Sequence, residues 1–417
     1  MDYNEFRTDA LKQYADLPDE LNELYKKYYM PIQLPEQNIK SEEPKTKETE
    51  KLKALVDDIE KKTRIKFDLV FSNSYIKNNT DFIKIKKMEE LYELLDKKIY
   101  KSSDNKLAAF VNAHATYALT AKIEKGKKHA LNILFVNSAD LIFEVIFEIE
   151  KDAEISISEL FMSTSENDAL IAPLQEFLVS ENAILNLDII NNCNKKTTVL
   201  NLSKGILMDH SKTKINFVYN GGKMTKAINF FNARGKASSI DATEILYGTG
   251  EQRFDINTYV INEKENTNTH LETGAVLDGN SQCILKGYAK VDKWTKGAIS
   301  RVNERGIIIS ENAHIDALPD MSIDYSEQVS ATHSAATSPI DKEVLFYMTA
   351  RGIEESKARK MFVASFLSKY LSEISRDVAK ELASSIMLSR IENDDFGVIN
   401  DTSPKGIWLT EKTEEII

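Results

Sequence analysis

The hydrophobic positions in the central part of the chain, from about residue 105 to residue 332, recur with a period of two. That period is typical of β-strands that bury one face. The alternating apolar positions include Val145, Phe147, Ile149, Ile155, Ile157, Phe254, Ile256 and Val260. Polar or glycine-containing segments separate the strand-like runs, as at 194–197, 220–223, 248–251 and 278–281. These segments have the composition of turns, so the pattern predicts many short strands.

Such a long run of short strands, without an intervening helical pattern, argues against a doubly wound α/β fold. A pair of sandwiches, a large barrel and a β-solenoid all stay open as interpretations. Asparagine-rich turns and polar outer positions favour the solenoid slightly, although no strict repeat can be counted.

The N-terminal part, residues 1–100, has a mostly helical pattern. Residues 17–29 form an amphipathic stripe, and residues 87–98 are a second helical candidate. Between them, residues 41–51 are charged and contain a proline, which indicates a solvated linker or the start of an exposed helix.

Beyond residue 338 the pattern becomes helical again. Ser338 can cap a helix that has Pro339 at its first position, and the segment 341–351 should end at Gly352. A second helix has Ala358, Met361, Phe362, Phe366 and Tyr370 on one face, and a third has Val378, Leu382 and Ile386. Residues 396–409 are expected to be an irregular or short-strand tail. We therefore divide the chain into 1–100, a strand-rich core at 101–335, and 336–417.

Composition and charge exclude several classes of protein. The 417 residues include 54 Lys and Arg against 65 Asp and Glu, for a net charge of −11, which disfavours nucleic-acid binding. The two cysteines, Cys193 and Cys283, are too few for a disulfide scaffold or for a cysteine-rich metal site made by this chain alone. With no visible secretory signal and no apolar run of membrane-spanning length, we expect a cytoplasmic protein without membrane contact.

Motifs for common chemistries are missing from the sequence. It contains no phosphate-binding G-x-x-x-x-G-K-[ST] loop, no C-x-x-C, no H-E-x-x-H and no G-x-S-x-G. The six histidines show no metal-ligand spacing, and each is most simply a surface or hydrogen-bonded residue. His333 differs in its context, because it lies among small residues where the strand pattern gives way to helices. The sequence therefore gives no support for these common metal and nucleophile chemistries.

One long motif at this junction resembles a known family. The segment H-S-A-A-T-S-P-I-D-K-E-V-L-F-Y-M-T-A-R-G-I, residues 333–353, is similar to the C-terminal signature of the SufB/SufD family of the SUF iron–sulfur cluster assembly system. Residues 286–291 and 306–310 fit the same family. The likeness is specific over about 280–370, looser over 200–280 and weak in the first 200 residues.

Within that family the chain looks more like SufD than SufB. A rough alignment puts Glu304 where SufB-type chains have a cysteine, and a carboxylate cannot replace a thiolate as a soft ligand. Ala331 stands where many SufD-type chains have a cysteine, and Ala336 stands where threonine is common.

The resemblance implies a mainly β fold, a right-handed parallel β-helix with N-terminal and C-terminal helical domains. It also implies a non-catalytic scaffold that pairs with SufB through the β-helix end and binds the ABC-type ATPase SufC through the C-terminal helices. Phe346, Tyr347, Arg351 and Phe362 would contact that ATPase. His333 would be a metal ligand shared with SufB, toward a transient iron or iron–sulfur cluster, with no cofactor bound stably by this chain. A homodimer is possible when the chain is alone.

Two other classes of function are compatible with the strand pattern. A β-helix enzyme of the secreted type that acts on carbohydrate would need a secretion route and clustered acid–base or Ca²⁺-binding residues, and the sequence shows neither. A solenoid interaction protein without a metal role would differ from the SUF reading mainly by the absence of neighbouring SufB-type and SufC-type genes.

Overall fold

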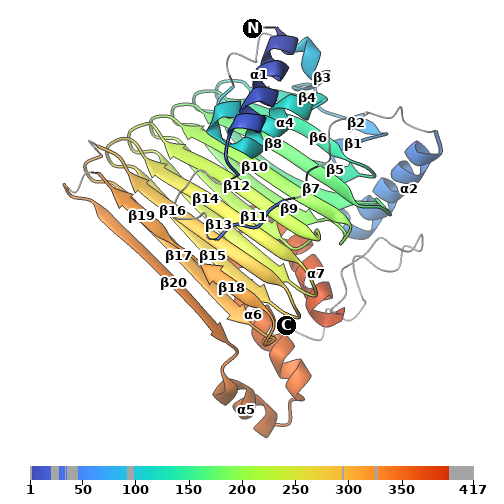
Figure 1. Ribbon diagram of the computed structural model, residues 1–417, viewed down its shortest axis with the longest axis vertical. Helices are drawn as coiled ribbons and strands as arrows, with labels where there is room; N and C mark the ends of the chain where they lie inside the picture. The colour runs from blue at the N-terminus through green and yellow to red at the C-terminus, as the bar shows by residue number, and fades with distance from the viewer. Residues whose placement is uncertain are drawn as a thin grey trace.

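The chain folds into a parallel β-helix of about eight turns, and the described residues include six α-helices that flank it in the N-terminal and C-terminal parts of the sequence (Figure 1). The computed structural model describes residues 2–19, 28–32, 34, 46–91, 98–293, 295–324 and 327–393. This architecture confirms the expected fold class and decides between the solenoid, the barrel and the sandwich pair.

Two long sheets form the walls of the β-helix. The first sheet contains, in spatial order, β2 (Ile76–Asn78), β1 (Leu69–Ser72), β5 (Lys128–Asn137), β7 (Glu154–Ser163), β9 (Ile184–Asn192), β11 (Lys212–Tyr219), β13 (Ser239–Gly248), β15 (Asn268–Leu277), β17 (Ile299–Ile308) and β20 (Ser330–Pro339). The second sheet contains β3 (Ile83–Lys87), β4 (Tyr117–Ile123), β6 (Leu141–Ile149), β8 (Ala169–Val179), β10 (Thr197–Leu207), β12 (Met224–Ala233), β14 (Arg253–Asn262), β16 (Gln282–Val291) and β18 (His314–Ala317), and β19 (Asp320–Ile323) also pairs with β16. Consecutive strands from β4 to β18 therefore alternate between the sheets.

Each turn stacks on the previous one in parallel register, but the number of residues per turn varies. Along one column of the first sheet, Ile133 pairs with Glu159, 26 residues later, whereas Thr273 pairs with Glu304, 31 residues later. The variation lies in the corners, where Asp152, Asn182 and Asn266 take the left-handed conformation that Asn and Asp tolerate best. This variation explains why no strict repeat could be counted in the sequence.

The inward-facing side chains of both sheets form the core of the β-helix. Val145, Phe147 and Ile149 are buried there, as their alternation predicted. At the N-terminal end this interior is rich in aromatic rings, with the ring centroids of Phe135 and Phe161 4.7 Å apart. The predicted turns at 194–197, 220–223, 248–251 and 278–281 all lie between consecutive strands.

The N-terminal part differs from the expected helical pattern in two respects. Strands β1, β2 and β3 lie inside the segment 1–100, and helix α4 (Lys106–His114) lies inside the segment expected to have no helix. Helices α1 (Tyr3–Asp16) and α4 contact each other and pack against the outer side of the second sheet, while α2 (Thr46–Thr63) packs against the first sheet.

The tail predicted at 396–409 lies wholly outside the described residues, and the amphipathic stripe at 17–29 lies mostly outside them. In the charged segment at 41–51, residues 46–51 are described and begin helix α2, which was one of the two interpretations. In the helical candidate at 87–98, Lys87 ends β3 and Met88–Glu90 form a single 3-10 turn, while residues 92–97 are not among those described. The domain boundaries proposed from the sequence stay predictions.

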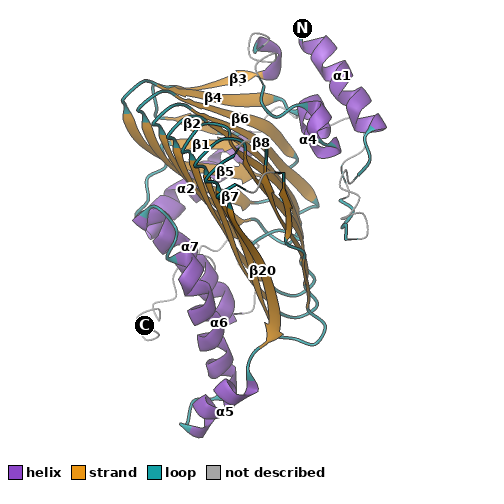
Figure 2. Cartoon of the chain, turned by 90° about the vertical axis from the view of Figure 1, so that its left-hand side faces the viewer, coloured by secondary structure: helices purple, strands orange, loops and turns teal. Residues whose placement is uncertain are grey.

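The three predicted C-terminal helices are present as α5 (Lys342–Ala350), α6 (Glu355–Leu371) and α7 (Asp377–Asn393). The predicted cap was wrong: Ser338 and Pro339 belong to β20, and Asp341 caps α5 by accepting a hydrogen bond from the Glu343 amide at 2.8 Å. Figure 2 shows α6 and α7 lying along one side of the β-helix, while α5 extends past its end.

Helix α6 is seated closely on the first sheet because β15 has a glycine beneath it. A Cβ atom at Gly274 would overlap with the ring of Tyr370, whose side chain is buried against the sheet. Tyr370, Leu367 and Leu371 belong to one hydrophobic cluster with the outward-facing residues Ile245 and Val276. The C-terminal helices thus share a core with the outer face of the β-helix.

We expect Gly274→Ala to lower the free energy of unfolding by about 1–3 kcal/mol, because the added methyl group overpacks the contact with Tyr370. Chemical denaturation followed by circular dichroism measures this loss. Combining Gly274→Ala with Tyr370→Ala provides the control, since the two losses should be far from additive if the ring is the obstacle. Additive losses would contradict the steric explanation.

Candidate interface at the C-terminal end of the β-helix

Strand β20 is the last strand of the first sheet and leaves one edge of that sheet open. It pairs with β17 on one side, and no described strand pairs with its other side. Nearly all of its residues are exposed, and their side chains are small, in the sequence Ser-Ala-Thr-His-Ser-Ala-Ala-Thr-Ser-Pro. Natural proteins protect such edges with lysines, bulges or a covering segment. Apart from Pro339 at its end, β20 has none of these features, so the backbone groups along its open edge are available to pair with another strand.

His333 lies in the middle of this edge strand. It pairs with Val302, which faces the interior, so its side chain lies on the inner side of the last turn and is exposed there. Its Nδ1 atom is 3.3 Å from the carbonyl oxygen of Pro319. Among the described residues, no group of three or more His, Cys, Asp or Glu side chains is arranged to hold a metal ion. Any metal bound at His333 would therefore need ligands from beyond the described residues.

The two cysteines are poor candidates for such ligands. Cys193 and Cys283 are both unpaired and buried in the β-helix interior. Burial raises the pKa of each thiol, and several buried or half-buried carboxylates raise that of Cys283 further. A thiol held in its protonated form is a weak nucleophile and a weak metal ligand.

Glu304 lies in β17, the strand that pairs with the last strand, β20. Its carboxyl group points into the interior and is buried, with Oε1 accepting a hydrogen bond from the Gly287 amide at 2.6 Å. No described group donates a hydrogen bond to its Oε2 atom. Burial raises the pKa of Glu304 to about 8, and the nearby Glu244 adds to that increase. Glu304 is therefore a neutral carboxylic acid at physiological pH, which agrees with its expected inability to act as a soft ligand.

Glu244 belongs to the same inward-facing column, two strands before Glu304. Its Oε1 accepts from the Thr258 hydroxyl at 2.5 Å and its Oε2 from the Thr273 hydroxyl at 2.8 Å. Burial raises its pKa as well. This polar column was not predicted from the sequence. It could have been, because Glu244 falls on an inward position of an alternating strand, between Ala242 and Leu246.

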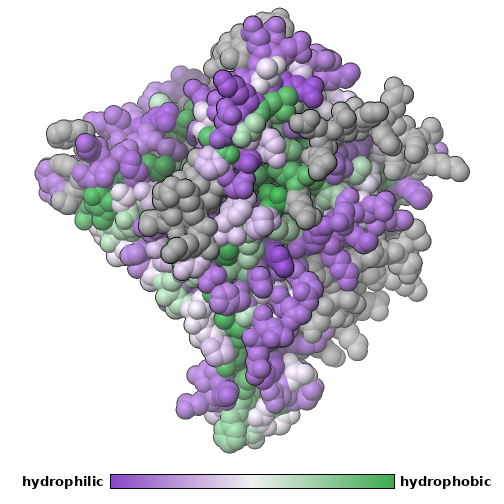
Figure 3. Space-filling model, viewed as in Figure 1, coloured by the Kyte–Doolittle hydropathy of each residue, from purple (hydrophilic) through white to green (hydrophobic). Residues whose placement is uncertain are grey.

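Helix α5 presents an exposed aromatic tip just beyond β20. Phe346 is 75% exposed, Tyr347 is 56% exposed and Val344 is 37% exposed. The guanidinium carbon of Arg351 is 4.3 Å from the centre of the Tyr347 ring. Figure 3 shows hydrophobic residues at this lower tip of the molecule, over α5. Phe362 differs from the other three predicted contact residues, because it is partly buried against the cluster beneath α6.

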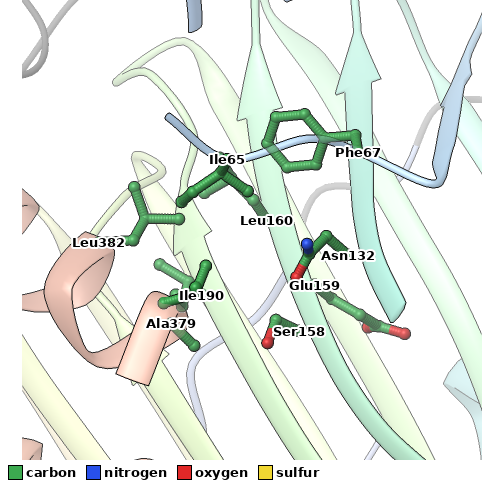
Figure 4. Close-up of a pocket in the computed structure, with 10 residues that line it drawn as sticks. Ile65, Phe67, Asn132, Ser158, Glu159, Leu160, Ile190, Ala379 and Leu382 are labelled. Atoms are coloured by element: carbon green, nitrogen blue, oxygen red, sulfur yellow. The ribbon is translucent and has the colours of Figure 1, made fainter. Parts of the chain in front are cut away.

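A hollow lies between α7 and the first sheet (Figure 4). Its walls are mostly apolar, with Ile65, Phe67, Leu160, Ile190, Val378, Ala379 and Leu382 among them. Its three polar side chains already have partners: the Nη1 atom of Arg376 is 2.7 Å from Asn132 Oδ1 and 3.1 Å from Ser158 Oγ, and Glu159 Oε2 accepts a hydrogen bond from Gln175 at 2.9 Å. The mostly apolar walls fit a contact between a docked helix and the sheet better than a site for a polar ligand.

Comparisons with known proteins identify a family whose match includes this end of the molecule. A family model described as "SUF system FeS cluster assembly, SufBD core domain" matches residues 136–366, which include β20, α5 and most of α6. The chain belongs to the SufBD core domain family. The earlier family resemblance is thereby confirmed.

Curated relatives within this family are distant in sequence. The chain is 24% identical over 285 residues to the iron–sulfur cluster assembly protein SufD of Bacillus subtilis (strain 168), covering 67% of this chain and 64% of that protein. It is 23% identical over 197 residues to an iron–sulfur cluster assembly SufBD family protein of Staphylococcus aureus (strain USA300), covering 45% of this chain and 42% of that protein. The aligned part thus spans less than two thirds of each of these relatives.

Within the described residues, no helix is both long and apolar enough to cross a membrane.

Replacing Glu304 by glutamine should remove part of the pH dependence of stability. The unfolded carboxyl group ionises near 4.5, whereas the folded one keeps its proton up to about 8. Folding therefore binds a proton between these values, so this group makes the protein less stable as pH rises through that window. We expect Glu304→Gln to be more stable than wild type by about 2 kcal/mol near pH 9 and by under about 1 kcal/mol near pH 5.

Urea unfolding at both pH values measures this difference. Glu311→Gln removes a carboxylate at an exposed site and is the matched control, which should change little at either pH. An equal effect of the two substitutions would show that Glu304 is not held neutral by burial.

Proposed function

We propose that the chain is a SufD-like, non-catalytic scaffold subunit for iron–sulfur cluster assembly. The observation that carries this proposal is the match to the SufBD core domain over residues 136–366. The curated SufD of Bacillus subtilis supports the SufD side of the family, as does the glutamate at position 304. The chain has no phosphate-binding loop of its own, so ATP would be bound by a partner.

The first proposed partner is a SufB-like subunit that pairs with β20. Adding a strand to an exposed sheet edge gains main-chain hydrogen bonds along its whole length. The open edge of β20, with ten residues of small side chains, supports such pairing. A homodimer formed through the same edge is the corresponding proposal for the chain when it is alone.

The second proposed partner is a SufC-like ABC-type ATPase that binds α5. Large aromatic side chains beside an arginine are the residues that most often supply binding energy at protein interfaces. Phe346, Tyr347 and Arg351 form such a group at the exposed tip. Phe362 would act indirectly, because its side chain is partly buried beneath the helices and supports their packing.

Replacing Phe346 and Tyr347 together by alanine should weaken capture of the SufC-like ATPase by at least about tenfold, since both rings are exposed and free to enter a pocket on the partner. A titration by calorimetry or interferometry measures the affinity. Ile323→Ala is the matched control, because Ile323 is an exposed apolar residue on another element, β19. Unchanged affinity in the double variant, with its unfolding midpoint preserved, would contradict the proposed ATPase site.

We also propose that iron or a nascent cluster is held transiently at the SufB interface, with His333 as one ligand. A neutral imidazole is a good ligand for iron, and the remaining ligands would come from the partner. We expect His333→Ala to leave assembly of the complex and ATPase stimulation intact, while lowering the iron and sulfide recovered with the complex.

Metal analysis of the purified complex measures this effect. His314→Ala is the matched control, since His314 is an exposed histidine on β18, at the same end of the β-helix. Unchanged iron content, or loss of the complex itself, would contradict the ligand role. If the chain binds both partners but the iron content of the complex does not depend on His333, the result would favour the alternative of an interaction protein without a metal role.

A reducing compartment, most simply the cytoplasm, is the proposed location. Both cysteines are unpaired and far apart in sequence, and cluster assembly requires thiols that stay reduced.

A further inference from the structure

Two arginines lie on the outer face of β17, immediately behind the open edge strand. Arg301 and Arg305 are both exposed, and neither forms a salt bridge or side-chain hydrogen bond with any described residue. Arg301 pairs in register with Thr332 of β20, and Arg305 pairs with Ala336. Two cations without a described ion pair therefore lie beside the open strand edge.

The residues on the side of Arg301 that faces β15 cannot neutralise its positive charge. His270 of β15 is next to Arg301 in the sheet, and it contacts Asp241 at 3.2 Å and Glu272 at 3.5 Å. Glu272 also accepts from Lys369 of α6 at 2.6 Å. Both nearby carboxylates are therefore already engaged. These two carboxylates raise the pKa of His270 to about 9, so a second positive charge faces Arg301 from that side.

The side of Arg305 that faces β15 offers no ion-pair partner either. The residue in register there is Gly274, which is covered by the ring of Tyr370. Tyr370 itself offers no carboxylate. Burial raises the pKa of its hydroxyl to about 12, Glu272 adds to that increase, and the positive charge of the nearby Arg305 opposes it. The side of Arg305 that faces β20 is open, because the residue there is Ala336.

The small side chains of β20 allow both arginines to reach a strand placed beyond it. Neighbouring strands are about 4.8 Å apart, so a strand added to β20 would lie about 10 Å from β17. An arginine and a glutamate side chain together span that distance across Thr332 or Ala336. Along the strand, Arg301 and Arg305 are four residues apart, which is about 13 Å.

We propose that Arg301 and Arg305 select, as the strand that pairs with β20, a partner strand with carboxylates at positions i and i+4 on its outer face. The inference rests on the edge pairing proposed above and adds the chemistry of the partner. A second copy of this chain fits less well, because Ser330–Pro339 contains no acidic residue. Bidentate pairing of arginine with carboxylate would fix the register of the added strand as well as its identity.

The test uses the full chain and the full-length SufB-like subunit encoded in the same genome. Wild type, Arg301→Glu/Arg305→Glu and the control Lys125→Glu/Lys127→Glu are titrated with that subunit at low and high salt. The control changes the net charge by the same amount at exposed residues of the corner before β5, at the opposite end of the β-helix. We expect the arginine variant to bind at least about tenfold more weakly at low salt and to lose the salt dependence, while the control matches wild type.

A photo-crosslinking residue at Thr332 then identifies the strand that lies against β20. The inference holds if that strand has Asp or Glu at positions i and i+4. It is overturned if the crosslinked strand lacks this spacing, if it is β20 of a second copy, or if the arginine variant binds within twofold of wild type with an unchanged salt dependence.

An Ala335→Pro variant separates this inference from the edge pairing on which it rests. Proline removes a main-chain donor from β20 and prevents regular pairing. If Ala335→Pro abolishes binding and the arginine variant does not, the pairing stands and the selection by charge fails. If neither variant affects binding, the pairing at β20 itself is wrong.

Discussion

A parallel β-helix satisfies the backbone of each turn with the turns before and after it, so its two ends are the places where the pattern breaks. At the N-terminal end, the two sheets end in β2 and β3, which are three and five residues long and contain lysines. Short strands with charged side chains protect a sheet edge. At the other end, the first sheet ends in β20, which is ten residues long, contains no Lys, Arg, Asp or Glu, and has a neighbour on one side only among the described strands. The exposed backbone groups, His333 and the two arginines without a described ion pair lie together at this less protected end, where the partner surfaces are proposed.

The interior between the sheets combines aromatic rings with buried acids. Near the N-terminal end, stacked rings such as Phe135, Phe143 and Phe161 fill the space between the sheets. One inward column contains Glu159 near that end and continues to Glu244 and Glu304 toward the C-terminal end. The hydrogen bonds of buried carboxylic acids only offset the cost of leaving water, so these positions add less stability than apolar side chains in the same places would.

The sequence predicted what depends on local periodicity and missed what depends on distant segments. The period of two in the strands and the three C-terminal helices were both visible. The alternation around Val145 puts Glu144 on the outward side of β6, yet it is buried, because Lys98, 46 positions earlier in the chain, lies against it and 3.1 Å from Glu176. Strand β1 has no partner within its own segment except the short β2, and its main pairing with β5 spans about sixty residues. The corners differ in length, so the repeat could not be counted in the sequence. The sequence of β20 does not show that it is an edge strand, because that depends on which strands lie beside it in the fold.

Strand β20 and helix α5 are joined by only two residues, Ile340 and Asp341, and this short connection links the two proposed partner surfaces. Ile340 is buried in the cluster that also holds Leu345 of α5, so the connection is fixed by packing as well as by the chain. Behind it, α6 is seated on Gly274 of β15 through Tyr370. A displacement of α5 by a bound protein would thus have two rigid paths, one directly into β20 and one through α6 into the sheet beneath it. The two proposed partner surfaces are therefore connected by packed side chains as well as by the chain itself.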